Sequence, residues 1–127
     1  MTGYVNQSEK LKVVSSFRKY ARLGLGNRKL SPFDVYDRIR GVCSSKSEAL
    51  DLLAVYDTMR LLRASNKIEV TNAVKAVYFS MQGKKPKKNE ISEKVLRHAI
   101  ENYCDERTVY RQLEYAKKLY KMLRLNY

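Results

Sequence analysis

Basic and polar side chains recur near the C-terminus at spacings that suit hydrogen bonding to DNA. Arg107 and Arg111 are one helical turn apart, and Gln112 and Lys118 follow them. An arginine can form two hydrogen bonds with a guanine edge, and a glutamine can do the same with adenine. Thr108, near the start of the helix, can donate to a phosphate beside the positive end of the helix dipole. These residues predict recognition of duplex DNA.

A helix over residues 106–125 must position these side chains. At about 100° per residue, an apolar stripe faces the core; it consists of Val109, Leu113, Ala116, Tyr120 and Leu123. The candidate contact surface lies opposite this stripe and on one of its flanks: Arg107, Thr108, Arg111, Gln112, Tyr115 and Lys118. Asp105 is the expected N-cap. The alternative interpretation is a solvated helix face with no specific partner.

The segment before this helix predicts the first half of a helix-turn-helix. A helix is expected over residues 92–103, and the hinge "NYCDE" separates it from the basic helix. The preceding loop contains "KKPKK", whose lysines are Lys84, Lys85, Lys87 and Lys88. We expect this loop to contact phosphates beside the groove, with a purely solvated loop as the alternative. Pro86 favours an extended backbone that can follow a phosphate chain.

Helical periodicity also dominates the rest of the chain. It predicts helices over residues 7–23 and 32–42, a third helix capped by Ser44 or Ser45, and a fourth over Ile68–Met81. Ser65 and Asn66 mark the break between the third and fourth helices. We therefore expect an all-α fold with an N-terminal lobe of about three helices, residues 1–64, and a helix-turn-helix lobe, residues 65–127.

Charge and composition narrow the classes of function. The 127 residues include 26 basic and 13 acidic side chains, which give a formal net charge of +13. Such an excess on a chain of globular composition indicates an anionic partner, with nucleic acid ahead of a membrane surface. No apolar run is long enough to span a bilayer, and the first residues lack the pattern of a signal peptide. We expect a cytoplasmic protein without a membrane partner.

Catalytic and metal-binding residues are sparse. Cys43 and Cys104 are too few for a zinc site and lack Cys-x-x-Cys spacing, and His98 is the only histidine. All three are expected to be ordinary helix residues. Gly24 and Gly26 lack the third glycine of a dinucleotide-binding loop. We expect no enzyme activity, no metal and no cofactor.

Two features leave alternatives open. An N-terminal basic set can contact flanking DNA or keep the chain soluble; it consists of Lys10, Lys12, Arg18, Lys19, Arg22, Arg28 and Lys29. The ten tyrosines can stack on unpaired bases, but at helical spacing they are more often core residues.

The C-terminal segment "DERTVYRQLEYAKKLYKMLR" resembles the second helix of region-4-like sigma-factor domains. Residues 50–127 more widely resemble phage late-gene transcriptional regulators of the ArpU and RinA type. The basic "QGKKPKKN" connection and the segment "VLRHAIENY" depart from the general sigma-factor pattern. The resemblance implies a sequence-specific regulator of transcription encoded by a phage or another mobile element.

Two other functions are alternatives to such a regulator. A small terminase-type DNA-packaging subunit also joins a helix-turn-helix to helical oligomerisation. A helical adaptor would bind RNA polymerase and would not read DNA itself. The sequence leaves the oligomeric state open, with a homo-oligomer among the alternatives.

Overall fold

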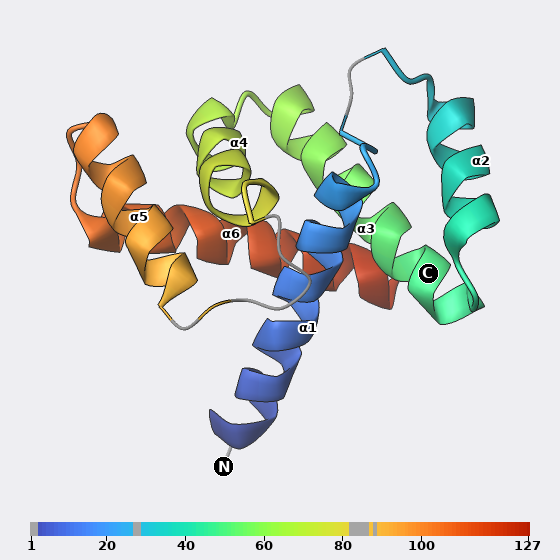
Figure 1. Cartoon of the computed structure of the whole chain (residues 1–127), viewed down its shortest axis with the longest axis horizontal. Coiled ribbons are helices and arrows are strands. Elements are labelled where there is room, and N and C mark those ends of the chain that lie inside the picture. Colours follow the sequence, from blue (N-terminus) through green and yellow to red (C-terminus); the bar gives the residue numbers. More distant parts are fainter. Residues whose placement is uncertain (1–2, 27–28, 82–86, 88) are drawn as a thin grey trace.

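The computed structural model describes residues 3–26, 29–81, 87 and 89–127, and it describes side chains from residue 13 onward. The elements in chain order are α1 (Gly3–Arg22), α2 (Pro32–Val42), α3 (Lys46–Ala64), α4 (Ile68–Val74), the π-helix η1 (Lys75–Phe79), α5 (Glu90–Glu101) and α6 (Glu106–Leu125) (Figure 1). No strand occurs in the described ranges, which confirms the predicted all-α fold.

Local capping explains where several helices begin. Ser31 accepts a hydrogen bond from the backbone of Asp34 at 3.2 Å, and the Asp34 carboxylate accepts one from the Ser31 backbone at 3.0 Å. This reciprocal box fixes the start of α2. Ser45, rather than Ser44, caps α3, because its hydroxyl accepts from the Glu48 backbone at 3.1 Å.

The fourth and fifth helices differ from their predicted bounds. The helix predicted over Ile68–Met81 ends at Phe79, and its last five residues form η1. The fifth helix begins at Glu90 instead of Ser92 because Asn89 adopts a left-handed backbone (φ 63°) and the Glu90 carboxylate accepts from the Lys87 backbone at 3.1 Å. The spacing of apolar residues does not indicate where a left-handed residue or a capping hydrogen bond begins or ends a helix.

One hydrophobic core joins the two halves of the chain. Phe17 of α1 packs its ring against Tyr78 of η1 and Tyr120 of α6, with centroid distances of 5.6 and 5.5 Å. Buried residues of α3, including Leu52 and Val55, belong to the same cluster as Leu113. The core therefore continues across the predicted lobe boundary at residues 64 and 65, which coincides with the turn between α3 and α4. α6 runs along one side of the molecule, with α1 crossing in front of it in Figure 1.

Candidate nucleic-acid interface

A tight turn joins α5 to α6. The Cys104 backbone donates to the Ala99 carbonyl at 3.0 Å, and the Tyr103 backbone donates to the Ile100 carbonyl at 3.3 Å. Together with the left-handed backbone of Tyr103 (φ 54°), these two bonds form the Schellman arrangement that ends helices. The fifth helix consequently stops at Glu101, two residues before its predicted end, and the chain turns directly into α6.

Asp105 caps the start of α6, as predicted. Its carboxylate accepts hydrogen bonds from the backbone and the hydroxyl of Thr108, at 3.0 and 2.9 Å. These bonds, the backbone bond foremost, hold the pKa of the Asp105 carboxyl below its usual value. The Thr108 hydroxyl proton is thus used inside the turn, so this side chain acts here as part of the cap.

The predicted apolar stripe of α6 faces the core. Val109, Leu113, Ala116 and Tyr120 are buried, whereas Leu123 near the end of the helix is half-buried. The Tyr120 hydroxyl donates to the Ser16 hydroxyl oxygen of α1 at 3.3 Å. Burial of this stripe fixes the rotation of α6 about its axis, and with it the direction of every other side chain on the helix.

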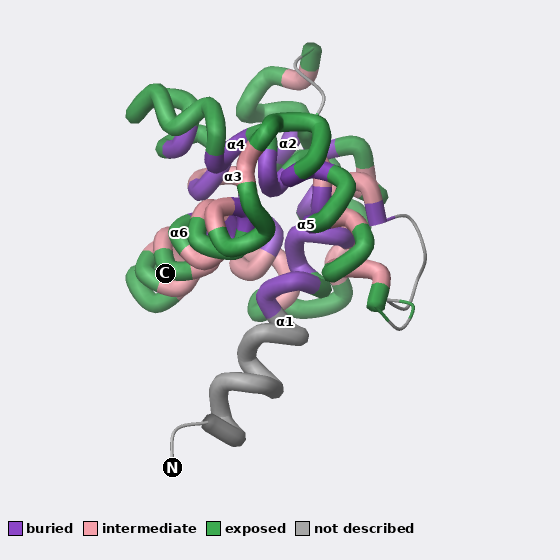
Figure 2. Tube along the Cα trace, turned by 90° about the vertical axis from the view of Figure 1, so that its left-hand side faces the viewer, coloured by how far each residue is buried: buried purple, intermediate pink, exposed green. Residues whose placement is uncertain are grey.

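The outer face of α6 carries Arg107, Arg111, Tyr115 and Lys118, all of them exposed. Figure 2 shows exposed residues along this outer side of the helix. Within the described part of the chain, Arg107, Arg111 and Lys118 form no salt bridge and no side-chain hydrogen bond. Their charges are therefore available to a partner outside the chain.

The tertiary structure adds Lys67 to this outer face. Its ammonium group lies 5.5 Å from the centroid of the Tyr115 ring, a distance that suits a cation–π interaction. Sequence reasoning missed Lys67 because it precedes α4, far from α6 in the chain. Only the packing of α4 against α6 brings these two side chains together.

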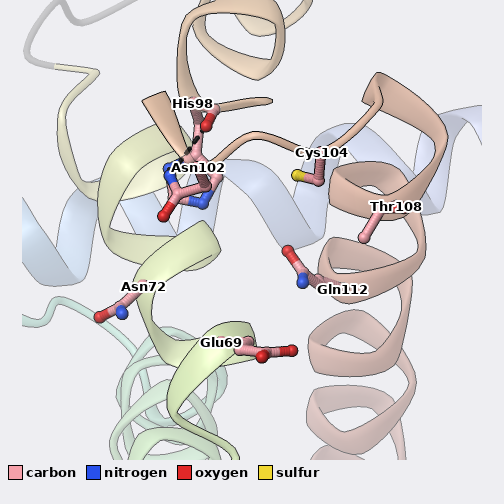
Figure 3. A pocket seen from close by; sticks show the side chains of 7 residues that line it. All are labelled: Glu69, Asn72, His98, Asn102, Cys104, Thr108 and Gln112. Atoms are coloured by element: carbon pink, nitrogen blue, oxygen red, sulfur yellow. Dashed lines mark hydrogen bonds between the residues drawn. The ribbon is translucent and has the colours of Figure 1, made fainter. Parts of the chain in front are cut away.

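Gln112 lies apart from Arg111, on the flank of α6 that faces α4. It lines a hollow of about 300 Å³, drawn in Figure 3, whose other lining residues are Glu69, Asn72, His98, Asn102, Cys104 and Thr108. The Asn102 amide nitrogen lies 3.1 Å from His98 Nδ1 and donates to the His98 carbonyl at 2.8 Å. Thr108 and Gln112 thus face this hollow rather than the outermost ridge of the helix.

Other basic residues of α6 bind within the fold. Lys117 donates to Glu114 at 3.2 Å and lies above the Tyr78 ring. Arg124 donates from Nε to Asp51 Oδ1 of α3 at 2.7 Å and from Nη2 to the Ser47 hydroxyl at 3.3 Å. Lys117 thus forms a salt bridge within α6, and Arg124 links α6 to α3.

The basic residues predicted elsewhere are only partly described. Lys84, Lys85 and Lys88 lie outside the described residues, while Lys87 is exposed. In the N-terminal basic set, Lys19 forms a salt bridge with Glu48 of α3, and Arg18 is buried. The side chains of Lys10 and Lys12, and residue Arg28, also lie outside the described part.

The described residues contain no group of three or more histidine, cysteine or acidic side chains able to hold a metal ion. Cys43 and Cys104 are free thiols. No helix in the described ranges is both long and apolar enough to span a membrane. Comparison of the chain with models of known protein families, with curated proteins and with solved structures found no match.

Proposed function

We propose that the protein binds duplex DNA in a sequence-specific manner through the outer face of α6. The observation that carries the proposal is the exposed set of Arg107, Arg111 and Lys118, which form no salt bridge with a described residue and lie on a helix whose opposite side is buried in the core. Such a helix can enter the major groove with its polar side chains directed at base edges.

The turn before α6 supports this mode of binding. α5 ends in a Schellman arrangement and Asp105 caps the start of α6, so the two helices meet at a short, hydrogen-bonded turn. In a helix-turn-helix the second helix occupies the groove while the first crosses the backbone. Arg97 of α5 is exposed and can contact a phosphate in that arrangement.

The resemblance of residues 50–127 to phage late-gene regulators extends the proposal to the biological role. We infer a transcriptional regulator of a phage or another mobile element, acting in the cytoplasm on double-stranded DNA, with RNA polymerase as a second partner. DNA binding itself requires no cofactor and no catalytic step.

Selection of bound duplexes from a random pool tests the proposal. We expect enrichment of one sequence, and affinity for it that falls with salt at a slope of about −0.9 in log K per neutralised phosphate. Enrichment of no sequence, with equal affinity for all duplexes, would contradict sequence-specific recognition. No binding at low salt would instead favour an adaptor that contacts only protein.

Replacement of Lys84, Lys85, Lys87 and Lys88 by alanine tests the loop before α5. If these lysines neutralise phosphates, the slope of log K against log salt should become shallower by about one to three units, while the enriched sequence stays the same. Binding should be measured at several salt concentrations with the selected duplex. An unchanged slope would show that the loop is only solvated.

A further inference from the structure

A second hollow lies at the end of α1, between that helix and residues of α2, α3 and η1. It has a volume of about 370 Å³ and is lined by Tyr20, Ala21, Gly24, Gly26, Arg38, Met59, Arg63, Lys75 and Phe79. Its volume is in the range of small-molecule sites. None of its lining residues belongs to α6, so the hollow is a different site from the outer face of that helix.

Aromatic and apolar side chains form the floor of this hollow. The rings of Tyr20 and Phe79 are stacked, with centroids 5.6 Å apart and planes inclined by 29°. Met59 is buried beside them, and Phe79 is only half-buried, so its ring borders the hollow. Burial also raises the pKa of the Tyr20 hydroxyl, which stays neutral. A planar, apolar group fits such a floor.

Three cations from three different elements surround the floor: Arg38 of α2, Arg63 of α3 and Lys75 of η1. All three are exposed, and none of them forms a salt bridge with a described residue. Among the described residues, no carboxylate lines the hollow. The nearby Asp57 is already engaged by Arg60 at 3.7 Å and by the Tyr127 hydroxyl.

The loop after α1 leaves room for the charged side chains. Gly24 adopts a positive φ of 71°, and a Cβ at this position would lie 3.6 Å from Nη1 of Arg38. The Arg38 guanidinium group therefore lies beside Gly24 at the edge of the hollow. A side chain at residue 24 would be strained by the positive φ, while its Cβ would make only ordinary van der Waals contact with Arg38.

We propose that this hollow binds a small anionic ligand with an aromatic ring, of the mononucleotide class. The base would lie against Phe79, and the phosphate would accept charge-assisted hydrogen bonds from Arg38, Arg63 and Lys75. A ligand with only an aromatic ring would make no use of the three cations, and a free phosphate would make no use of the aromatic floor. A ligand that carries both groups matches both parts of the hollow. The proposal is independent of DNA binding by α6.

Calorimetric titration of the whole chain tests this site. The probes are the 5′-monophosphates of adenosine, guanosine, cytidine and uridine, with adenosine and inorganic phosphate as the two half-ligands. We expect at least one monophosphate to bind about tenfold or more tightly than either half-ligand, because both parts of the hollow are then filled. Equal binding of inorganic phosphate and every monophosphate would overturn the proposal.

A matched pair of variants on α3 separates the site from general attraction to a basic protein. Arg63→Ala removes a cation of the hollow, whereas Arg60→Ala removes the same charge from a residue paired with Asp57 outside it. Arg63→Ala should weaken binding about tenfold or more, and Arg60→Ala by about twofold or less. Equal losses in the two variants would show nonspecific attraction and overturn the site.

A third variant tests the hollow by shape instead of charge. Ala21→Leu places a larger side chain in the space that Ala21 lines and keeps every cation. Thermal melting should show a folded protein, and monophosphate binding should be weakened by about tenfold or more as the space is occupied. Unchanged affinity in a folded Ala21→Leu protein would contradict binding in this hollow.

Discussion

The basic residues of α6 fall into two groups that differ in surroundings rather than in chemical type. Lys117 and Arg124 are bound to Glu114 and Asp51 within the fold. Arg107 and Arg111 point away from the core and have no such partner among the described residues. The difference shows that two factors separate structural cations from those available to a ligand. These are the position of the cation around the helix axis and the acidic residues near it, on α6 itself for Lys117 and on α3 for Arg124.

The largest expected effect concerns the buried side of α6. Leu113 is 1% exposed, so Leu113→Ala leaves a cavity in the core and should lower the free energy of unfolding by about 2–5 kcal/mol. Denaturant unfolding measures this loss. Arg111→Ala on the opposite side is the control and should change stability by about 0.5 kcal/mol or less. Equal destabilisation by the two substitutions would mean that the assigned faces of α6 are wrong.

The second prediction concerns Arg111, one of the two exposed arginines of α6. If Arg111 contacts a guanine edge with two hydrogen bonds, Arg111→Ala should weaken binding to the selected duplex by about 1–3 kcal/mol. Binding to random duplex should decrease much less, by about one phosphate contact. Direct titration of both duplexes measures the two losses. An equal loss on both would place Arg111 at a phosphate and away from the bases.

The third prediction concerns Arg124, one of the two cations that bind acidic residues within the fold. Arg124→Ala removes a charge-assisted hydrogen bond to Asp51 and a contact with Ser47, so it should destabilise the fold by about 1–2 kcal/mol. The preferred DNA sequence should stay the same, because Arg124 lies on a different side of α6 from Arg111. A changed preference for DNA sequence without a change in stability would contradict the division of the α6 cations into structural and DNA-contacting residues.

The smallest expected effect concerns the cap that begins α6. Because hydrogen bonds lower the pKa of Asp105 from 3.8 in the folded state, the carboxylate contributes stability above that pH. This contribution is lost as the pH falls through the lower, folded pKa. Asp105→Asn should therefore melt earlier than the wild type at pH 6, and the gap should narrow below about pH 4. A constant gap across this range would exclude a contribution from the carboxylate charge.

Local sequence signals predicted much of the helical framework. The helix predicted over residues 32–42 has these bounds in the structure, and Asp105 caps α6 as predicted. The predicted apolar stripe of α6 is buried from Val109 to Tyr120 and half-buried at Leu123, because helical periodicity indicates which side of a helix faces the core. Both ends of α5 differ from their predicted positions, because Asn89 and Tyr103 adopt left-handed backbone conformations that the spacing of apolar residues does not indicate.

The sequence by itself determined the helical class, the excess of positive charge and the side of α6 that carries Arg107 and Arg111. These properties follow from composition and from spacing along a single helix. Only the tertiary structure decided that Lys67 lies over Tyr115, that Asp51 binds Arg124, and that Gln112 faces a hollow beside α4. Each of these contacts joins residues far apart in the chain, so it depends on how the helices pack and not on the pattern within any one of them.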